Sequence, residues 1–307
     1  MAHMKNLIKL IITIVIFYFL LQYIDFEHVI KVLAKSHGGF ILLALLAQLA
    51  STVIAAYRWR LIMKLLDFHE RVSFYVQSYF RGSFFNQVLP SSIGGDAVRA
   101  IELVQRGYDK KDSIYGIFVD RIIGLVGLLV LNLFANNLFY GSFPSWLHQL
   151  LNLITISAIA GFSMLFIIEK FTFLTKYSFS NLFVRLSKRL NKLYGDKMLL
   201  IQHIFISVIV HIFSILAIYA LALSVEVDLN LQTLLIAIPP VFLLTIVPIS
   251  LAGWGVRESG MVGILMLVGA QKEEILVISV LYGLLLILAA LPGAWFWNRN
   301  KQLLQEK

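Results

Sequence analysis

Six apolar stretches, each long enough to cross a lipid bilayer as a single helix, recur along this sequence. They are Leu7–Ile24, Phe40–Tyr57, Ser113–Asn136, Leu150–Ile168, Met198–Val225 and Ile275–Trp297. A transmembrane helix needs about 20 mostly apolar residues, and in hydrocarbon its backbone N–H and C=O groups must be satisfied within the segment. We therefore predict an all-α polytopic membrane protein with six full transmembrane helices.

The composition supports this class and excludes others. Of 307 residues, 59% are hydrophobic and 14% are charged, and the mean hydropathy is +0.84, which leaves too little polar surface for soluble domains. The absence of cysteine excludes disulfides and thiolate chemistry. The net charge of +9 is explained by loops facing anionic lipid headgroups rather than by nucleic acid. Residues 1–3, which precede a second Met, are interpreted as a cloning remnant.

Two further apolar regions are interrupted by Pro and Gly and do not fit a straight span. Residues 72–106 are broken at Leu89–Gly95, and residues 229–270 are broken at Val247–Gly253. Pro and Gly end helices, and non-helical backbone at membrane depth is tolerated only against protein or a wet cavity. We expect each region to form a re-entrant helical hairpin beside the six spans.

The distribution of basic residues predicts the orientation. If the N-terminus is inside and each hairpin enters and leaves on one side, 21 of the 26 Lys and Arg residues lie in cytoplasmic segments, Arg58 and Arg81 among them. The outer segments then hold only Lys31, Lys35 and Lys272, and Arg121 and Arg257 lie within the membrane. By the positive-inside rule, both termini are expected in the cytoplasm of a prokaryotic cell, at its cytoplasmic membrane.

The two breaks share the pattern Pro-x-Ser-x-x-Gly-x-x-Val-Arg. The matching positions, all offset by 158, are Pro90, Ser92, Gly95, Val98 and Arg99 in the first region and Pro248, Ser250, Gly253, Val256 and Arg257 in the second. The expected topology makes the two hairpins open to opposite sides, which predicts an inverted-topology repeat. Residues 4–140 would form the first unit, residues 141–198 a fourth span and a basic amphipathic cytoplasmic segment that open the second, and residues 199–307 the rest.

The breaks and the charges near them define a candidate binding site. A half-helix that starts at a break, beside Gly94 or Gly255, presents free N–H groups and positive potential, which suit an anion such as phosphate. Arg99 and Arg257 follow the breaks closely, and a guanidinium fork suits phosphate. The candidate substrate-binding residues are Asn86, Ser92, Asp96, Arg99, Asp120, Arg121, Ser250, Arg257 and Glu258.

Two interpretations of the intramembrane charges remain open. A charge within a span costs about 2.5–3.5 kcal/mol on insertion scales, so each one needs a partner or a function. Asp96, Glu102 and Asp120 either form structural ion pairs that hold the hairpins against the bundle, or they position the arginines on a headgroup. Asp120 and Glu258 are also candidate proton carriers.

Three stretches resemble signatures of the lysylphosphatidylglycerol synthase transmembrane family, in the right order over nearly the whole chain. They are Phe85–Arg99 (FNQVLPSSIGGDAVR), Val119–Arg121 (VDR) and Val247–Glu258 (VPISLAGWGVRE), with mild departures at Ala252 and Trp254. The resemblance implies a flippase-like protein, since the corresponding region of the multidomain enzymes moves aminoacylated lipid outward and some relatives serve polyprenyl-phosphate sugar pathways. No aminoacyl-transferase domain fits within these residues, so lysyl-lipid synthesis is not implied.

We therefore expect a flippase-like transporter of a phosphate-containing lipid, with an aminoacyl-phospholipid or polyprenyl-phosphate-linked headgroup. No nucleophile, metal, cofactor or nucleotide-binding motif is found, so the chain is not expected to be an enzyme and transport would be downhill or ion-coupled. Two alternatives are a non-transporting partner that presents lipid to a separate enzyme and an intramembrane lipid-phosphate transferase. The expected partners are anionic or polyprenyl-phosphate lipids, and not nucleic acid.

Overall fold

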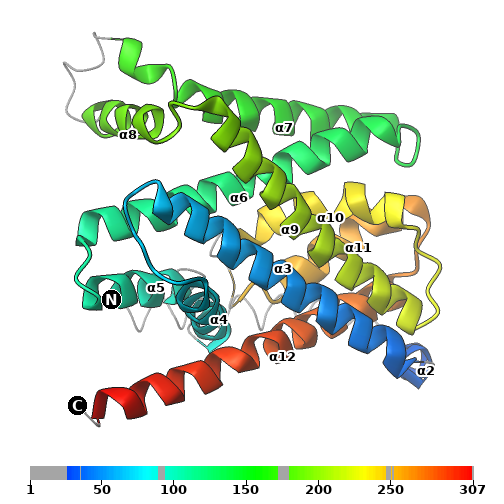
Figure 1. Cartoon of the computed structure of the whole chain (residues 1–307). Helices are drawn as coiled ribbons and strands as arrows, with labels where there is room; N and C mark the ends of the chain where they lie inside the picture. The colour runs from blue at the N-terminus through cyan, green and yellow to red at the C-terminus, as the bar shows by residue number, and fades with distance from the viewer. Residues whose placement is uncertain are drawn as a thin grey trace.

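The computed structural model describes residues 26–34, 36–88, 94–171, 180–246, 250 and 252–305 (Figure 1). Throughout these ranges all regular structure is helical, which confirms the predicted fold class. Several predictions concern residues outside the described ranges: the cloning remnant at 1–3, the span at Leu7–Ile24, and the break residues Pro90, Ser92 and Pro248.

Five described helices are long and apolar enough to cross a membrane. They are α3 (Gly38–Lys64), α6 (Lys110–Leu138), α7 (Ser145–Met164), α9 (Lys197–Ser224) and α12 (Lys272–Gln305). Each contains one of the predicted spans or most of it, because the apolar stretch that lipid requires is a local property of the sequence. The protein is therefore a polytopic helical membrane protein.

Two pairs of shorter helices occupy the regions predicted to be hairpins. The first pair is α4 (Val72–Val88) and α5 (Gly94–Gln105), and the second is α10 (Leu231–Ile246) and α11 (Val256–Leu265). The helices of each pair pack against one another, and each pair is divided at the Pro- and Gly-containing segment. Insertion of the two pairs from opposite sides of a membrane stays a prediction.

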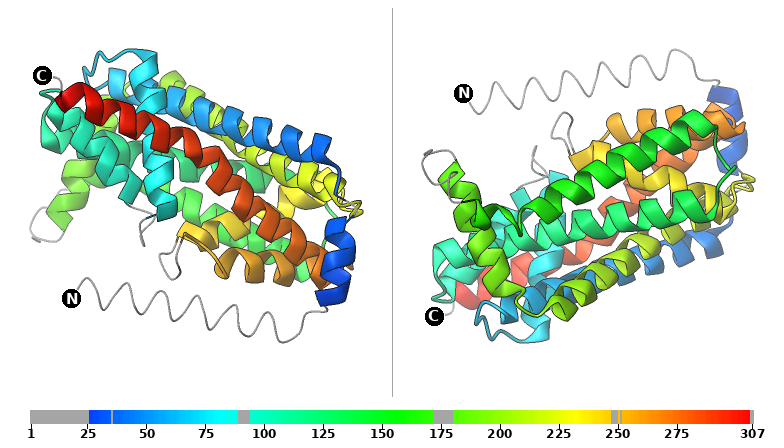
Figure 2. Two further views of the ribbon diagram at one scale, coloured as in Figure 1. Left: turned by 90° about the horizontal axis from the view of Figure 1, so that it is seen from below. Right: turned by 90° about the horizontal axis from the view of Figure 1, so that it is seen from above.

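Each of the two predicted units contributes a short helix that packs against a long helix of the other unit. Helix α4 packs against α12, the last helix of the second unit, and α10 packs against α6, the last long helix of the first. The long helices α3 and α9 pack side by side along one side of the bundle, as Figures 1 and 2 show. That the helices form two related units of inverted topology stays a prediction.

The ends of the bundle differ in composition. Helix α8 (Ser180–Leu193) and the C-terminal end of α12 lie at one end, and α2 (Phe26–Ala34) lies at the other (Figure 2). On α8, Val184 and Leu190 are buried while Lys188 and Lys192 are exposed, so this helix is amphipathic and basic as predicted. Its buried face packs on residues of α6 and α7.

Close helix crossings depend on small residues. A Cβ atom added at Gly127 of α6 would collide with Ser207 of α9, and one added at Gly95 of α5 would collide with the backbone of Gly82 on α4. Gly95 therefore allows the two arms of the first hairpin to touch, and this contact positions the charged residues that follow on α5.

Candidate functional site

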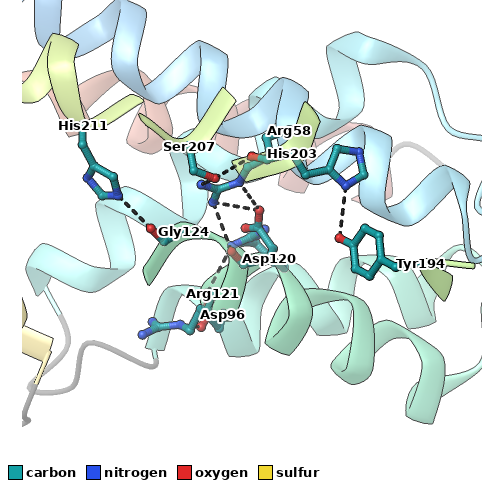
Figure 3. Close-up of polar contacts among 10 residues, drawn as sticks. Arg58, Asp96, Asp120, Arg121, Gly124, Tyr194, His203, Ser207 and His211 are labelled. Carbon is teal, nitrogen blue, oxygen red and sulfur yellow. Dashed lines mark hydrogen bonds and ion pairs between the residues drawn. The ribbon is translucent and has the colours of Figure 1, made fainter. Parts of the chain in front are cut away.

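A buried carboxylate joins three helices inside the bundle. Asp120 of α6 is 1% exposed; its Oδ1 accepts a hydrogen bond from Arg58 Nε of α3 at 2.9 Å, and its Oδ2 accepts one from Arg99 Nη2 of α5 at 2.9 Å. Arg58 also donates to Ser207 Oγ of α9 at 2.8 Å (Figure 3). A carboxylate in this place lets two buried guanidinium groups coexist, since either alone would be an uncompensated charge.

The row of charges continues outward from Arg99. Asp96 Oδ1 accepts a hydrogen bond from Arg99 Nη1 at 3.2 Å, and its Oδ2 forms an ion pair with Arg121 Nε. The side chains of Asp96 and Arg121 are 14% and 39% exposed, whereas those of Arg58 and Asp120 are 4% and 2% exposed. Basic and acidic groups thus alternate from the buried centre toward the surface, and three Arg face two Asp.

Arg99 is held between two aromatic faces. Its guanidinium carbon lies 3.9 Å from the ring centre of Trp59 and 4.5 Å from that of Tyr79, an arrangement that attracts a cation through the ring quadrupoles. Its buried Nε has no hydrogen-bond partner within the described part of the chain. The buried Arg99 therefore keeps one N–H group unsatisfied within the described residues, while its other two nitrogens bind Asp96 and Asp120.

The start of α5 is positioned by the opposite arm of the hairpin. The Asn86 side-chain oxygen of α4 accepts a hydrogen bond from the backbone N–H of Gly95 at 2.8 Å. This bond satisfies one of the N–H groups that every helix start leaves open. Asn86, predicted as a ligand-binding residue, thus also has a role in the fold.

These side chains surround one cavity of about 440 Å³. Its lining includes five of the predicted site residues: Asn86, Asp96, Arg99, Asp120 and Arg121. Phe242, Thr245 and Ile246 of α10 also line it, so the cavity lies between the first hairpin and the first arm of the second. We call it the polar cavity.

Arg257, the second Arg of the repeated pattern, forms a network of its own. Arg257 Nη2 donates to Glu258 Oε1 at 2.5 Å, and Glu258 Oε2 accepts the backbone N–H of Gly255 at 2.5 Å. Ser279 Oγ of α12 lies 3.4 Å from Arg257 Nε, and both charged side chains are buried. Gly255 has a φ of 83°, in the left-handed region that glycine enters without strain.

The described side chains do not bring Arg99 and Arg257 into one cavity. Arg257, Glu258 and the buried Ser250 are absent from the described lining of the polar cavity. A role of Arg257 in headgroup binding, expected from the sequence repeat, stays a prediction. In the structure the Arg257 network joins the start of α11 to α12.

Two arginines that the sequence analysis assigned to cytoplasmic segments are buried within the protein. Arg58 lies within α3, because this helix continues past Tyr57 to Lys64, and Arg81 of α4 forms a buried ion pair with Glu102 of α5. A helical signal for Arg58 existed: it shares one face with the buried residues Gln48, Ser51, Ala55 and Ile62. The partner Ser207 carries the same kind of signal, since it shares one face of α9 with the buried residues His203, Val210 and Ser214.

An all-helical bundle with five apolar helices and a charged cavity in its interior defines a multi-pass membrane protein with an internal polar site. More narrowly, the chain belongs to the lysylphosphatidylglycerol synthase TM region family, whose profile matches residues 6–293. This match confirms the family suggested by the three motifs.

Two named proteins are similar to the chain. The UPF0104 membrane protein MJ1595 of Methanocaldococcus jannaschii is 25% identical over 284 residues, which cover 84% of this chain and 83% of that protein. The UPF0104 membrane protein PH1989 of Pyrococcus horikoshii is 28% identical over 203 residues, or 63% of this chain and 58% of that protein. Both names describe membrane proteins, in agreement with the fold.

Proposed function

We propose that this protein is a flippase-like transporter that moves a phosphate-containing lipid across the prokaryotic cytoplasmic membrane, with both termini in the cytoplasm. The observation that carries the proposal is the buried charge of Arg99, which lines the polar cavity together with Asp120 and Arg121. A charge buried among apolar helices is energetically costly, so an ionisable residue in such a place usually has a function.

The chemistry of the polar cavity suits a phosphate. Arg58, Arg99 and Arg121 contribute three positive charges against the two of Asp96 and Asp120, so an anion completes the balance. The guanidinium of Arg99 is already oriented by two aromatic rings and by Asp120, which lowers the entropy lost when it binds a ligand. The headgroup would be an aminoacyl-phospholipid or a polyprenyl-phosphate-linked group.

The proposed transport cycle uses the two predicted units of the repeat. Rocking of one unit against the other would open the polar cavity to alternate sides while the lipid tails remain in the bilayer. Movement would be downhill or coupled to protons, with Asp120 and Glu258 as the candidate carriers. The chain would act without enzymatic chemistry and without a cofactor.

Lipid translocation in proteoliposomes tests the proposal. The assay compares a neutral lipid, phosphatidylglycerol, an aminoacylated phosphatidylglycerol and a short polyprenyl-phosphate sugar. Headgroup-selective movement by the unaltered protein that Arg99→Gln abolishes is the expected result. The matched control is the double variant Arg81→Gln, Glu102→Gln, which removes an equally buried pair outside the cavity lining and should leave selectivity intact.

Two other outcomes would overturn the transport proposal. No movement of any lipid by folded protein, together with copurification of one lipid-modifying enzyme, would identify a lipid-presenting partner. Formation of a new lipid product from a phosphate-bearing donor would identify an intramembrane transferase.

A further inference from the structure

An apolar groove adjoins the polar cavity on the surface of the bundle. It has a volume of about 590 Å³ and lies between α5 and α6, where Ala100 and Ile101 of α5 face Ile114 and Ile117 of α6. Ile101 and Ile114 are 55% and 51% exposed, so the groove presents an apolar surface to the surroundings of the bundle. We call this surface the α5–α6 groove.

The groove and the polar cavity meet. Asp96, Phe118, Arg121 and Ile246 line both. Two of these four residues form the Asp96–Arg121 ion pair, so this pair lies at the border between the apolar surface and the charged interior. The pair is also the most exposed member of the row of charges described above.

The two compartments together match an amphipathic molecule. The groove offers hydrocarbon contacts, and the cavity offers an excess of positive charge close to Arg99, whose Nε has no partner in the described chain. A free anion would occupy only the polar cavity, and an apolar helix of another protein would occupy only the α5–α6 groove. A lipid with an anionic headgroup fits both, because its two chemically distinct ends are joined.

We propose that a phospholipid from the bilayer reaches the polar cavity sideways through the α5–α6 groove, and that the Asp96–Arg121 ion pair is the gate. The hydrocarbon chain lies along Ile114 and Phe118, and the phosphate replaces Asp96 as the partner of Arg121 before it reaches Arg99. This inference rests on the proposed function, since it takes the polar cavity as the headgroup site.

A binding experiment tests the route without requiring transport. The chain has no cysteine, so Ile114→Cys carries a single bimane fluorophore in the groove. Phe134→Cys, on the same helix and 70% exposed but outside the described groove lining, is the matched control. Each labelled protein is placed in phosphatidylcholine vesicles containing an equal share of spin-labelled phosphatidylglycerol or spin-labelled phosphatidylcholine, and quenching is compared.

The expected result is stronger quenching by phosphatidylglycerol than by phosphatidylcholine at position 114, and equal quenching at position 134. Adding Arg121→Gln should abolish the preference at 114, and adding Asp96→Asn should increase it, because the competing carboxylate is neutralised. A general attraction of anionic lipid to Lys110 or to α8 would survive Arg121→Gln and would overturn the inference.

The outcomes separate the two proposals. Headgroup-selective transport without a preference at 114 would overturn the α5–α6 route and leave the transporter proposal standing. A preference at 114 that depends on Arg121, in a protein that moves no lipid, would support the route and contradict transport.

Discussion

Asp120 accepts hydrogen bonds from Arg58 and Arg99 on its two separate oxygens, each at 2.9 Å. The three residues come from α3, α5 and α6, so one carboxylate ties the first hairpin to two long helices. The Arg58 to Ser207 bond extends the connection to α9. The candidate site and the stability of the bundle therefore depend on the same side chain.

Replacing Asp120 with Asn should destabilise the protein strongly. Removing one partner of a buried ion pair costs about 3–5 kcal/mol because the other charge stays buried, and here two arginines lose their partner. Thermal unfolding in detergent should show a large drop in Tm. The control is Asp112→Asn, which breaks an ion pair with Arg189 whose side chains are over 40% exposed and should cost about 0–1 kcal/mol. Equal effects of the two changes would contradict the assigned role.

Gly95→Ala should separate the arms of the first hairpin. The added methyl group would meet the backbone of Gly82 and the Asn86 side chain, and backbone cannot move aside as a flexible side chain can. Transport and thermal stability should both fall. Gly263→Ala on α11 is the matched control, since no atom lies within 4 Å of its added Cβ and Ala is favoured over Gly in a helix by about 1 kcal/mol. A neutral Gly95→Ala would show that the hairpin packing is looser than described.

Arg99→Lys should lose function while keeping the charge. Lys preserves a cation near Asp120 but lacks the planar fork that lies between Trp59 and Tyr79. Lipid binding should weaken far more than thermal stability does. Tyr79→Phe keeps a ring over Arg99 and should remain active, whereas Trp59→Leu should weaken binding by about 0.5–2 kcal/mol. Full activity of Arg99→Lys would reduce the role of Arg99 to that of a point charge.

Neutral variants distinguish the roles of the two buried arginines, Arg99 and Arg257. If Arg257 serves the fold, Arg257→Gln alone should destabilise the protein, and the double variant Arg257→Gln, Glu258→Gln should recover both stability and transport. Because Asp120 also pairs with Arg58, the matching change for Arg99 is the single variant Arg99→Gln, which keeps the Arg58–Asp120 pair and should retain stability but lose transport, since the headgroup loses its ligand. Loss of transport in a stable Arg257 double variant would instead establish the shared headgroup site that the sequence repeat predicts.

The positions of the helices and of the breaks could be predicted because the deciding properties are local. Apolar stretches marked α3, α6, α7, α9 and α12, and Pro and Gly marked the divisions between α4 and α5 and between α10 and α11. Such signals involve neighbouring residues alone, since a helix needs its own hydrogen bonds and an apolar surface for lipid.

Five of the predicted site residues line the polar cavity, among them Arg99 and Asp120, because intramembrane charges are costly and therefore noticeable in a sequence. Arg58 was assigned to a cytoplasmic segment because the apolar stretch ends at Tyr57. In the structure α3 continues to Lys64, so Arg58 lies within the helix and its guanidinium group faces Asp120.

The sequence by itself determined the class of protein, the family, the positions of the five described spans, the regions of the two short helix pairs and most of the charged residues of the polar cavity. Only the tertiary structure decided which charges pair, because Arg58 and Asp120 are 62 positions apart and Arg58 and Ser207 are 149 positions apart. It also separated Arg99 from Arg257 in the described cavity lining and placed the α5–α6 groove beside Arg121. Pairing and cavities depend on how helices cross, and crossing depends on contacts such as Gly95 with Gly82, which no local pattern reveals.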